Sequence, residues 1–131
     1  MRRLSLVLAL AVMACSSATT TTGSGAPSPS DRRNTISAEE IAKARTPGWF
    51  AYELINSLRP NFLKAHNAVS LESRDPIYAD VYLNEVYHGD IDSLKSLPID
   101  AITSITYLSP FDAATRFGKE MPGGALMIRT H

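Results

Sequence analysis

The residues best suited to catalysis or metal binding are few and scattered along this sequence. The three histidines, His66, His88 and His131, lack the paired spacing that metal ligands need. The run His88-Gly89-Asp90-Ile91-Asp92 sets two carboxylates near an imidazole, and carboxylates suit a hard cation. A polar loop that caps a helix just after a strand accounts for the same residues more simply. We therefore predict no metal site and no cofactor.

Motifs of the common enzyme classes are also missing. The sequence has no Gly-x-Ser-x-Gly turn and no phosphate-binding loop, and Gly123-Gly124 lacks the Lys-Ser/Thr pair that such a loop requires. Gly123-Gly124 is better interpreted as a tight turn. An enzyme would need Asp80, Asp90 and Asp92 to converge on one point. We predict that the protein is not an enzyme.

The single cysteine lies at the end of an export signal. Met1-Arg2-Arg3 is positive, and residues 4–13 form an apolar stretch that is too short for a membrane span of about 20 residues. Val12-Met13-Ala14-Cys15 follows, and it resembles the lipobox of bacterial lipoproteins. The resemblance implies a signal peptide over residues 1–14 and a lipidated Cys15. The alternative is an ordinary cleaved signal peptide with a cysteine nearby.

The segment over residues 15–34 begins with Cys15, and its residues 16–30 are small or Pro, mostly Ser, Thr, Gly and Pro, and cannot form a core. We expect this segment to be a flexible tether between the lipid and a folded domain. Serine after the lipidated cysteine is similar to lipoproteins sorted to the outer membrane. The expected location is therefore the periplasmic face of the outer membrane, with the lipid anchor as the membrane contact.

Chain length and charge limit the number of domains and the kinds of partner. A chain of 131 residues has room for one domain, which we place at residues 35–131. The whole chain has 13 Lys and Arg and 13 Asp and Glu, and its basic residues form no continuous stripe. A nucleic-acid partner is therefore not expected.

Local signals predict short helices in the first half of this domain. Ser37-Ala38-Glu39-Glu40 is a capping box. Thr46 and Pro47 suit the N-cap and first position of a second helix, with an apolar face through Leu54 and Leu58. Pro60 should end this helix near Leu58.

The second half alternates between strands and helical turns. Residues 77–83 have the period of a strand, and Asn84-Glu85 should turn the chain into a hairpin; the turn type stays open because Glu85 suits a primed turn poorly. Asp90 or Asp92 can cap a short helix. Residues 102–108 suit an interior strand and residues 125–130 a last strand.

Between these two strands, Ser109 should cap a helix that Gly118 ends, with Phe111, Ala114 and Phe117 as core candidates. Strand, short helix and strand suggest a right-handed crossover. The predicted fold class is α+β, with short helices on a small mixed sheet.

The order of motifs over residues 35–131 resembles the plug domain of TonB-dependent outer-membrane receptors. The resemblance is carried by Ile36–Ile41, by Leu58-Arg59-Pro60, by Val81–Val86 and by the run from Ile102 to Thr130. Glu85 is a departure, because plugs have glycine near that position. A barrel of such receptors needs more than roughly 200 residues of strand, so this chain alone is not expected to transport. The resemblance implies an accessory protein-interaction module, with an outer-membrane receptor or transport complex as partner.

Four aromatic residues are candidates for an interaction surface: Trp49, Tyr52, Tyr78 and Tyr82. Packing within the core is the competing explanation for each. The interaction hypothesis predicts an exposed strand edge or aromatic patch. The alternative function is capture of a small ligand, a chelate or an oligosaccharide, and it predicts a concave pocket near residues 84–90 and 118–124.

Overall fold

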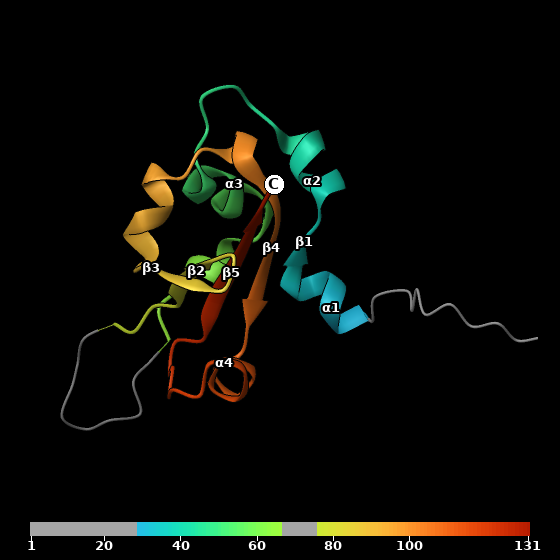
Figure 1. Cartoon of the computed structure of the whole chain (residues 1–131). Helices are drawn as coiled ribbons and strands as arrows, with labels where there is room; N and C mark the ends of the chain where they lie inside the picture. The colour runs from blue at the N-terminus through green and yellow to red at the C-terminus, as the bar shows by residue number, and fades with distance from the viewer. Residues whose placement is uncertain (1–28, 67–75) are drawn as a thin grey trace, which may run out of the picture.

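A computed structural model of the chain describes residues 29–66 and 76–131 (Figure 1). The predicted signal peptide and Cys15 lie outside these residues. The described part is an α+β domain built on one five-stranded mixed sheet of strand order β1-β4-β5-β2-β3, which confirms the predicted fold class. The strands are β1 (Thr35–Ile36), β2 (Asp80–Leu83), β3 (Val86–Gly89), β4 (Ile102–Leu108) and β5 (Ala125–Thr130).

Strand β5 forms the centre of the sheet. It runs antiparallel to β4, from the pair Ile102 and Thr130 to the pair Leu108 and Ala125. On its other side it runs parallel to β2, with Asp80 opposite Ala125. The predicted crossover between β4 and β5 is therefore wrong. The connection leaves β4 at Leu108 and returns beside it at Ala125, so the chain never travels back along the sheet as a crossover must.

Helices and turns cover one face of the sheet. They are α2 (Ala38–Ala44), α3 (Ala51–Leu58) and the 3₁₀ helices η1 (Pro60–Leu63), η2 (Ile91–Ser96) and η3 (Ile99–Ala101). Their buried side chains join those of the sheet in one main core, which includes Leu54, Leu94, Ile105, Leu126 and Ile128. Residues 79, 81 and 83 of the β2 segment face this core, as the alternating pattern predicts.

The helix boundaries follow the local signals, with one exception. Ser37 caps α2 in the predicted capping box, and α3 ends at Leu58 just before Pro60. However, α3 begins at Ala51, so Thr46 and Pro47 do not start it. Phe50 makes an isolated bridge with Pro98, and the Ala51 amide donates to Leu97 O at 2.8 Å. These long-range bonds hold the chain extended until Phe50 and delay the helix.

A smaller core lies against the other face of the sheet. It consists of Tyr82, Ala113, Met121 and Ala125, with Leu108 and Phe117 packed beside it. Helix α4 (Pro110–Phe117) supplies Ala113 and Phe117, and Figure 1 shows it at the opposite end of the domain from α2. Ser109 and Gly118 cap α4 as predicted. Phe111 is not a core residue, because 79% of it is exposed; Ala113, two positions later, faces the sheet instead.

The last residues of the predicted tether are helical. Residues Pro29–Asn34 form α1, which leads directly into β1 at one edge of the sheet (Figure 1). Thr35 pairs with Thr106 of β4, and their hydroxyl oxygens lie 3.3 Å apart. The folded domain therefore begins before residue 35, and the tether prediction is wrong for residues 29–34.

Candidate interaction site

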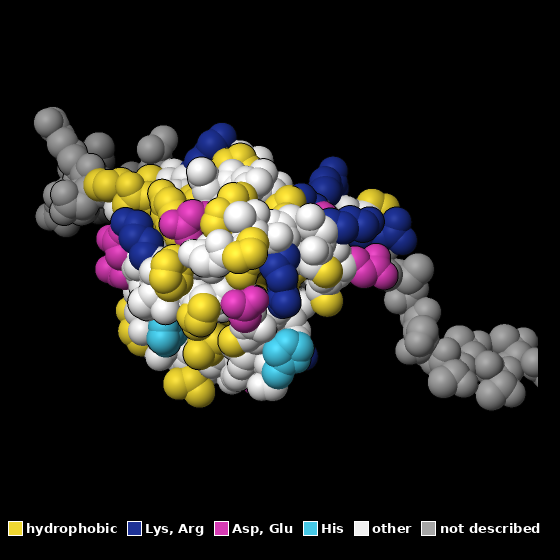
Figure 2. Space-filling model, turned by 90° about the horizontal axis from the view of Figure 1, so that it is seen from above, with side chains coloured by type: hydrophobic (Ala, Val, Ile, Leu, Met, Phe, Trp, Pro, Cys, Tyr) yellow, Lys and Arg dark blue, Asp and Glu magenta, His cyan; other side chains and the backbone are white. Residues whose placement is uncertain are grey.

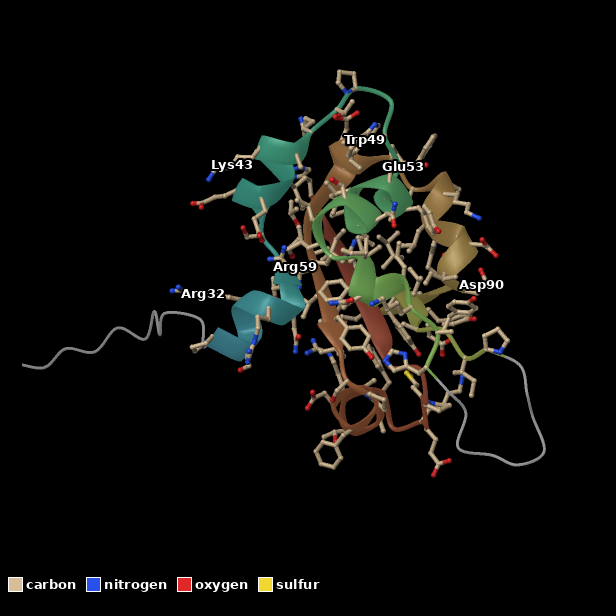
Figure 3. All side chains as sticks on the ribbon, turned by 180° about the vertical axis from the view of Figure 1, so that it is seen from behind. Arg32, Lys43, Trp49, Glu53, Arg59 and Asp90 are labelled. Atoms are coloured by element: carbon tan, nitrogen blue, oxygen red, sulfur yellow. The ribbon has the colours of Figure 1, made fainter. Side chains whose placement is uncertain are left out.

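The four aromatic residues selected from the sequence do not form one surface. Trp49 and Tyr52 are partly buried and pack against the main core. The Tyr52 ring also lies beneath the Lys95 ammonium, whose nitrogen is 5.2 Å from the ring centroid. Tyr78 is 43% exposed. In Figure 3, Trp49 lies beside Glu53 near one end of the domain, away from Asp90 and the β3 region.

Tyr82 belongs to the smaller core and not to the surface, since only 7% of it is exposed. Its ring stacks on Phe117, with centroids 3.9 Å apart, and meets the edge of the Tyr87 ring at 5.6 Å. Burial, helped by the Asp80 charge, raises the pKa of the Tyr82 phenol. The prediction that Tyr82 belongs to an interaction surface is wrong. β2 is an inner strand of the sheet, and both of its faces are covered.

Two exposed apolar side chains lie together on β3, at the edge of the sheet, whereas the exposed Phe50, Tyr78 and Phe111 lie on other segments. Val86 is 68% exposed and Tyr87 is 56% exposed, and His88 is exposed as well. Among the described residues, β3 pairs with β2 alone. Sequence reasoning missed Val86 and Tyr87 because alternation shows which residues share a face, but not which strand ends at the edge.

The turn before β3 is tied to two other elements. Asn84 and Glu85 both have positive φ, 48° and 73°, which defines a primed turn. The Asn84 side chain donates to the Thr130 hydroxyl at 2.8 Å and accepts from the Thr130 amide at 3.0 Å. The Glu85 carboxylate pairs with Arg116 of α4. The hairpin is therefore held by β5 and α4 at its tip, while no other described strand pairs with the outer side of β3.

A bulge limits the usable length of this edge. Tyr82 lies opposite Tyr87 but Val81 lies opposite Gly89, so one extra residue is inserted in β3. Bulges shorten the regular pairing that an edge offers to other chains. We define the β3 edge as Val86, Tyr87 and His88, which ends at the extra residue, His88.

The acidic residues near β3 have structural roles. Asp90 caps η2, accepting from the Asp92 amide at 3.2 Å, and Asp92 pairs with Lys95 at 2.6 Å. Asp80 lies 3.8 Å from the Lys119 ammonium instead. Within residues 29–66 and 76–131, no group of three or more His, Cys, Asp or Glu side chains could hold a metal ion.

Four hollows of the described residues bear on the small-ligand hypothesis. A shallow one of about 260 Å³ borders Glu120, Met121 and Pro122. Three others, of about 630, 470 and 380 Å³, lie around α1 and β1. Figure 2 shows Lys and Arg side chains on this α1 side of the molecule. Residues 120–122 fall within the range 118–124 where small-ligand capture predicts a pocket, whereas residues 84–90 line none of these four hollows.

Comparison with known proteins adds no relative. No family model, no curated protein and no solved structure matches this chain. In the described part of the chain, no helix has the length and apolar character needed to cross a membrane.

Proposed function

We propose that this protein is an exported lipoprotein, anchored through Cys15 at the periplasmic face of the outer membrane, whose plug-like domain binds another envelope protein. The partner contributes an extended segment that pairs with the β3 edge. The observation that carries this proposal is the edge strand β3, which pairs with β2 alone among the described residues and exposes Val86 and Tyr87 on a hairpin whose tip is fixed. The proposal includes no catalytic activity.

The backbone of β3 supports this mode of binding. In a two-residue hairpin the amide of Val86 is directed to the carbonyl oxygen of Leu83 across the turn. Because inward and outward positions alternate along an antiparallel strand, the amide and carbonyl of Tyr87 are directed away from β2. A partner strand can pair with these groups, and its side chains can contact the Tyr87 ring. The ring rests against Tyr82 and is therefore partly ordered before binding, which lowers the entropic cost of association.

A matched pair of variants at residue 87 tests the strand-pairing mode. Tyr87→Thr removes the ring, whereas Tyr87→Pro removes the ring and also the outward amide. Proline at this position costs no bond to β2, because the lost amide is directed outward. We expect capture of the partner from native membranes to fall further with Tyr87→Pro than with Tyr87→Thr, at equal thermal stability. Equal losses would show that the edge backbone plays no part.

Photocrosslinking identifies what pairs with the edge. A photoreactive residue at position 86 should give one discrete heterologous product, and Tyr87→Pro should abolish it. The same residue at position 96, which is exposed on η2, serves as the control and should give none. A product with twice the mass of the chain would instead identify a second copy as the occupant, and equal products at 86 and 96 would overturn the proposal.

A further inference from the structure

Helix α4 presents an apolar outer face to solvent. Phe111 is the most exposed of the large hydrophobic residues that the structure describes, with 79% of it accessible. Pro110 and Thr115 are exposed beside it, and Ala114 is partly buried. We call these four residues the α4 face. The Thr115 hydroxyl donates to Phe111 O at 2.9 Å, so the one polar side chain of this face has its hydrogen bond within the helix.

The apolar surface continues beyond the helix on one side. The shallow hollow of about 260 Å³ lies between α4 and the segment before β5. Four of the five described residues that line it are apolar, namely Pro110, Ala114, Met121 and Pro122, and the fifth is Glu120. Apolar side chains therefore extend from the α4 face across this end of the domain.

The α4 face is held in place by the packing of the opposite side of the helix. Ala113 is fully buried, and Phe117 stacks on the buried Tyr82 with ring centroids 3.9 Å apart. Rotating α4 to bring Phe111 into the core would break both contacts. The exposure of Phe111 is therefore a consequence of the fold and not of a loose helix.

The α4 face lies near the point where the proposed anchor joins the domain. The hollow of about 380 Å³ is lined both by Phe111 and by Asn34, the last residue of α1. A helix of six residues, such as α1, is about 9 Å long. Figure 1 shows α1 and β3 on opposite sides of the domain and α4 at its lower end. Lipid attached at Cys15 is therefore brought to the side of the domain that carries Phe111.

The tether alone does not determine which face of the domain meets the bilayer. The chain between Cys15 and Pro29 can span at most about 50 Å, which allows many orientations. Because the anchor already holds the domain at the membrane, contact between a face and the lipid is an intramolecular step. Burying one exposed phenylalanine then favours its own orientation about tenfold over the others.

We infer that the α4 face rests on the lipid bilayer that carries the anchor, with the Phe111 ring inserted at the bilayer surface. The inference rests on the proposed lipid anchor at Cys15. The bilayer is the occupant because the segment outside the described residues leads from the lipid to α1, beside this face. Docking then gives the β3 edge one orientation relative to the membrane.

The test anchors the chain artificially and asks which face contacts lipid. The chain that begins at Cys15 is coupled through this thiol, the only one in the sequence, to a maleimide lipid in neutral phosphatidylcholine vesicles. A photoreactive phenylalanine analogue stands at position 111 or, as the matched control, at position 50. Phe50 is also exposed, at 39%, but it lies at the start of α3, and Figure 1 shows α3 and α4 at opposite ends of the domain.

We expect the yield of lipid adduct at position 111 to exceed that at position 50 by about fivefold or more. Equal yields would show that the tether lets both ends reach the bilayer and would overturn the inference. A product with twice the mass of the chain at position 111 would identify a second copy as the occupant, and this result would overturn it as well.

Two substitutions of Phe111 test the role of its ring. With the photoreactive residue moved to position 115 on the same face, Phe111→Gln should lower the yield of lipid adduct about fivefold, whereas Phe111→Leu should keep most of it. Both variants are expected to fold, because the side chain is exposed. An undiminished yield with Phe111→Gln would contradict insertion of the ring.

The experiment distinguishes failure of the docking from failure of the anchor. Mass spectrometry of the chain isolated from cells shows whether Cys15 carries acyl chains. Their absence overturns the proposed anchor, whatever the coupled chain does in vesicles. Their presence, together with equal yields at positions 50 and 111, overturns the docking alone.

Discussion

At the scale of single residues, Ser37 and Thr46 both carry a hydroxyl group, but only Ser37 caps a helix. The Ser37 hydroxyl accepts from the Glu40 amide at 3.4 Å, and Glu40 accepts from the Ser37 amide at 3.0 Å. The Thr46 hydroxyl donates to Ala44 O at 3.4 Å and caps no helix. The cap of α3 comes from Glu53, whose carboxylate accepts from the Phe50 amide at 3.0 Å.

These contacts give a prediction for two substitutions of similar size. Ser37→Ala should lower the free energy of unfolding by about 1 kcal/mol, the usual loss for an N-cap. Thr46→Ala should change it by less than about 0.5 kcal/mol, as expected for an exposed position. Urea denaturation of both variants measures the difference. Equal effects would contradict the assignment of the cap.

Glu40 links the capping box to the rest of the domain and gives it a pH dependence. Burial raises the pKa of its carboxyl, but the Ser37 amide and the Arg59 guanidinium together outweigh burial and hold the pKa below its ordinary value. A lowered folded-state pKa means that this contribution to stability is present above the unfolded-state pKa. It is lost as the pH falls through the folded-state pKa.

At the scale of elements, the β2–β3 hairpin combines a strained turn with a fixed tip. A non-glycine residue in the left-handed region costs about 1–2 kcal/mol, and Glu85 lies there with φ 73°. Its exposed ion pair with Arg116 is worth about 0–1 kcal/mol. The strain is therefore the larger of the two effects.

We predict that Glu85→Gly raises the free energy of unfolding by roughly 0.5 kcal/mol, the difference between relieved strain and the lost ion pair. Glu85→Gln keeps the strained backbone and loses only the charge, so it should be neutral or slightly destabilising. Thermal unfolding of the three proteins gives the order. A glycine variant less stable than the glutamine variant would contradict the balance of these effects.

Local signals explain which elements could be predicted from the sequence. The capping box, the stop at Pro60, the left-handed Gly118 and the alternation along β2 depend on neighbouring residues, and all are present. The start of α3 depends on Pro98, which pairs with Phe50 across the fold. The exposure of Phe111 and of β3 depends on helix rotation and strand order, which no local window contains. The same holds for the hollow of about 380 Å³ beside Phe111, because its lining comes from α1, β1, β4 and α4.

At the scale of the whole molecule, the proposed lipid anchor determines where the domain acts. Its exposed β3 edge and the junction of α1 with β1 lie at opposite edges of the sheet. A membrane attachment that leads into α1 therefore leaves β3 at the far edge, where it can meet another envelope protein.

The anchor predicts a simple fractionation result. The natural chain should be found with the outer membrane and incorporate labelled palmitate, whereas Cys15→Ser should do neither, because two or more acyl chains hold a protein stably on a bilayer. Ser17→Ala is the matched control and should behave as the natural chain. Release of the natural chain as a free periplasmic protein would favour an ordinary cleaved signal peptide.

The central position of β5 also has a consequence for the timing of folding. The pair β1–β4 and the hairpin β2–β3 touch through β5, which follows both in the sequence. During synthesis, the sheet therefore consists of two separate halves until residues 125–130 have emerged. Contacts between segments so distant along the chain form slowly. On the export that we propose, the chain is expected to cross the inner membrane unfolded and to complete its sheet late, once residues 125–130 are available.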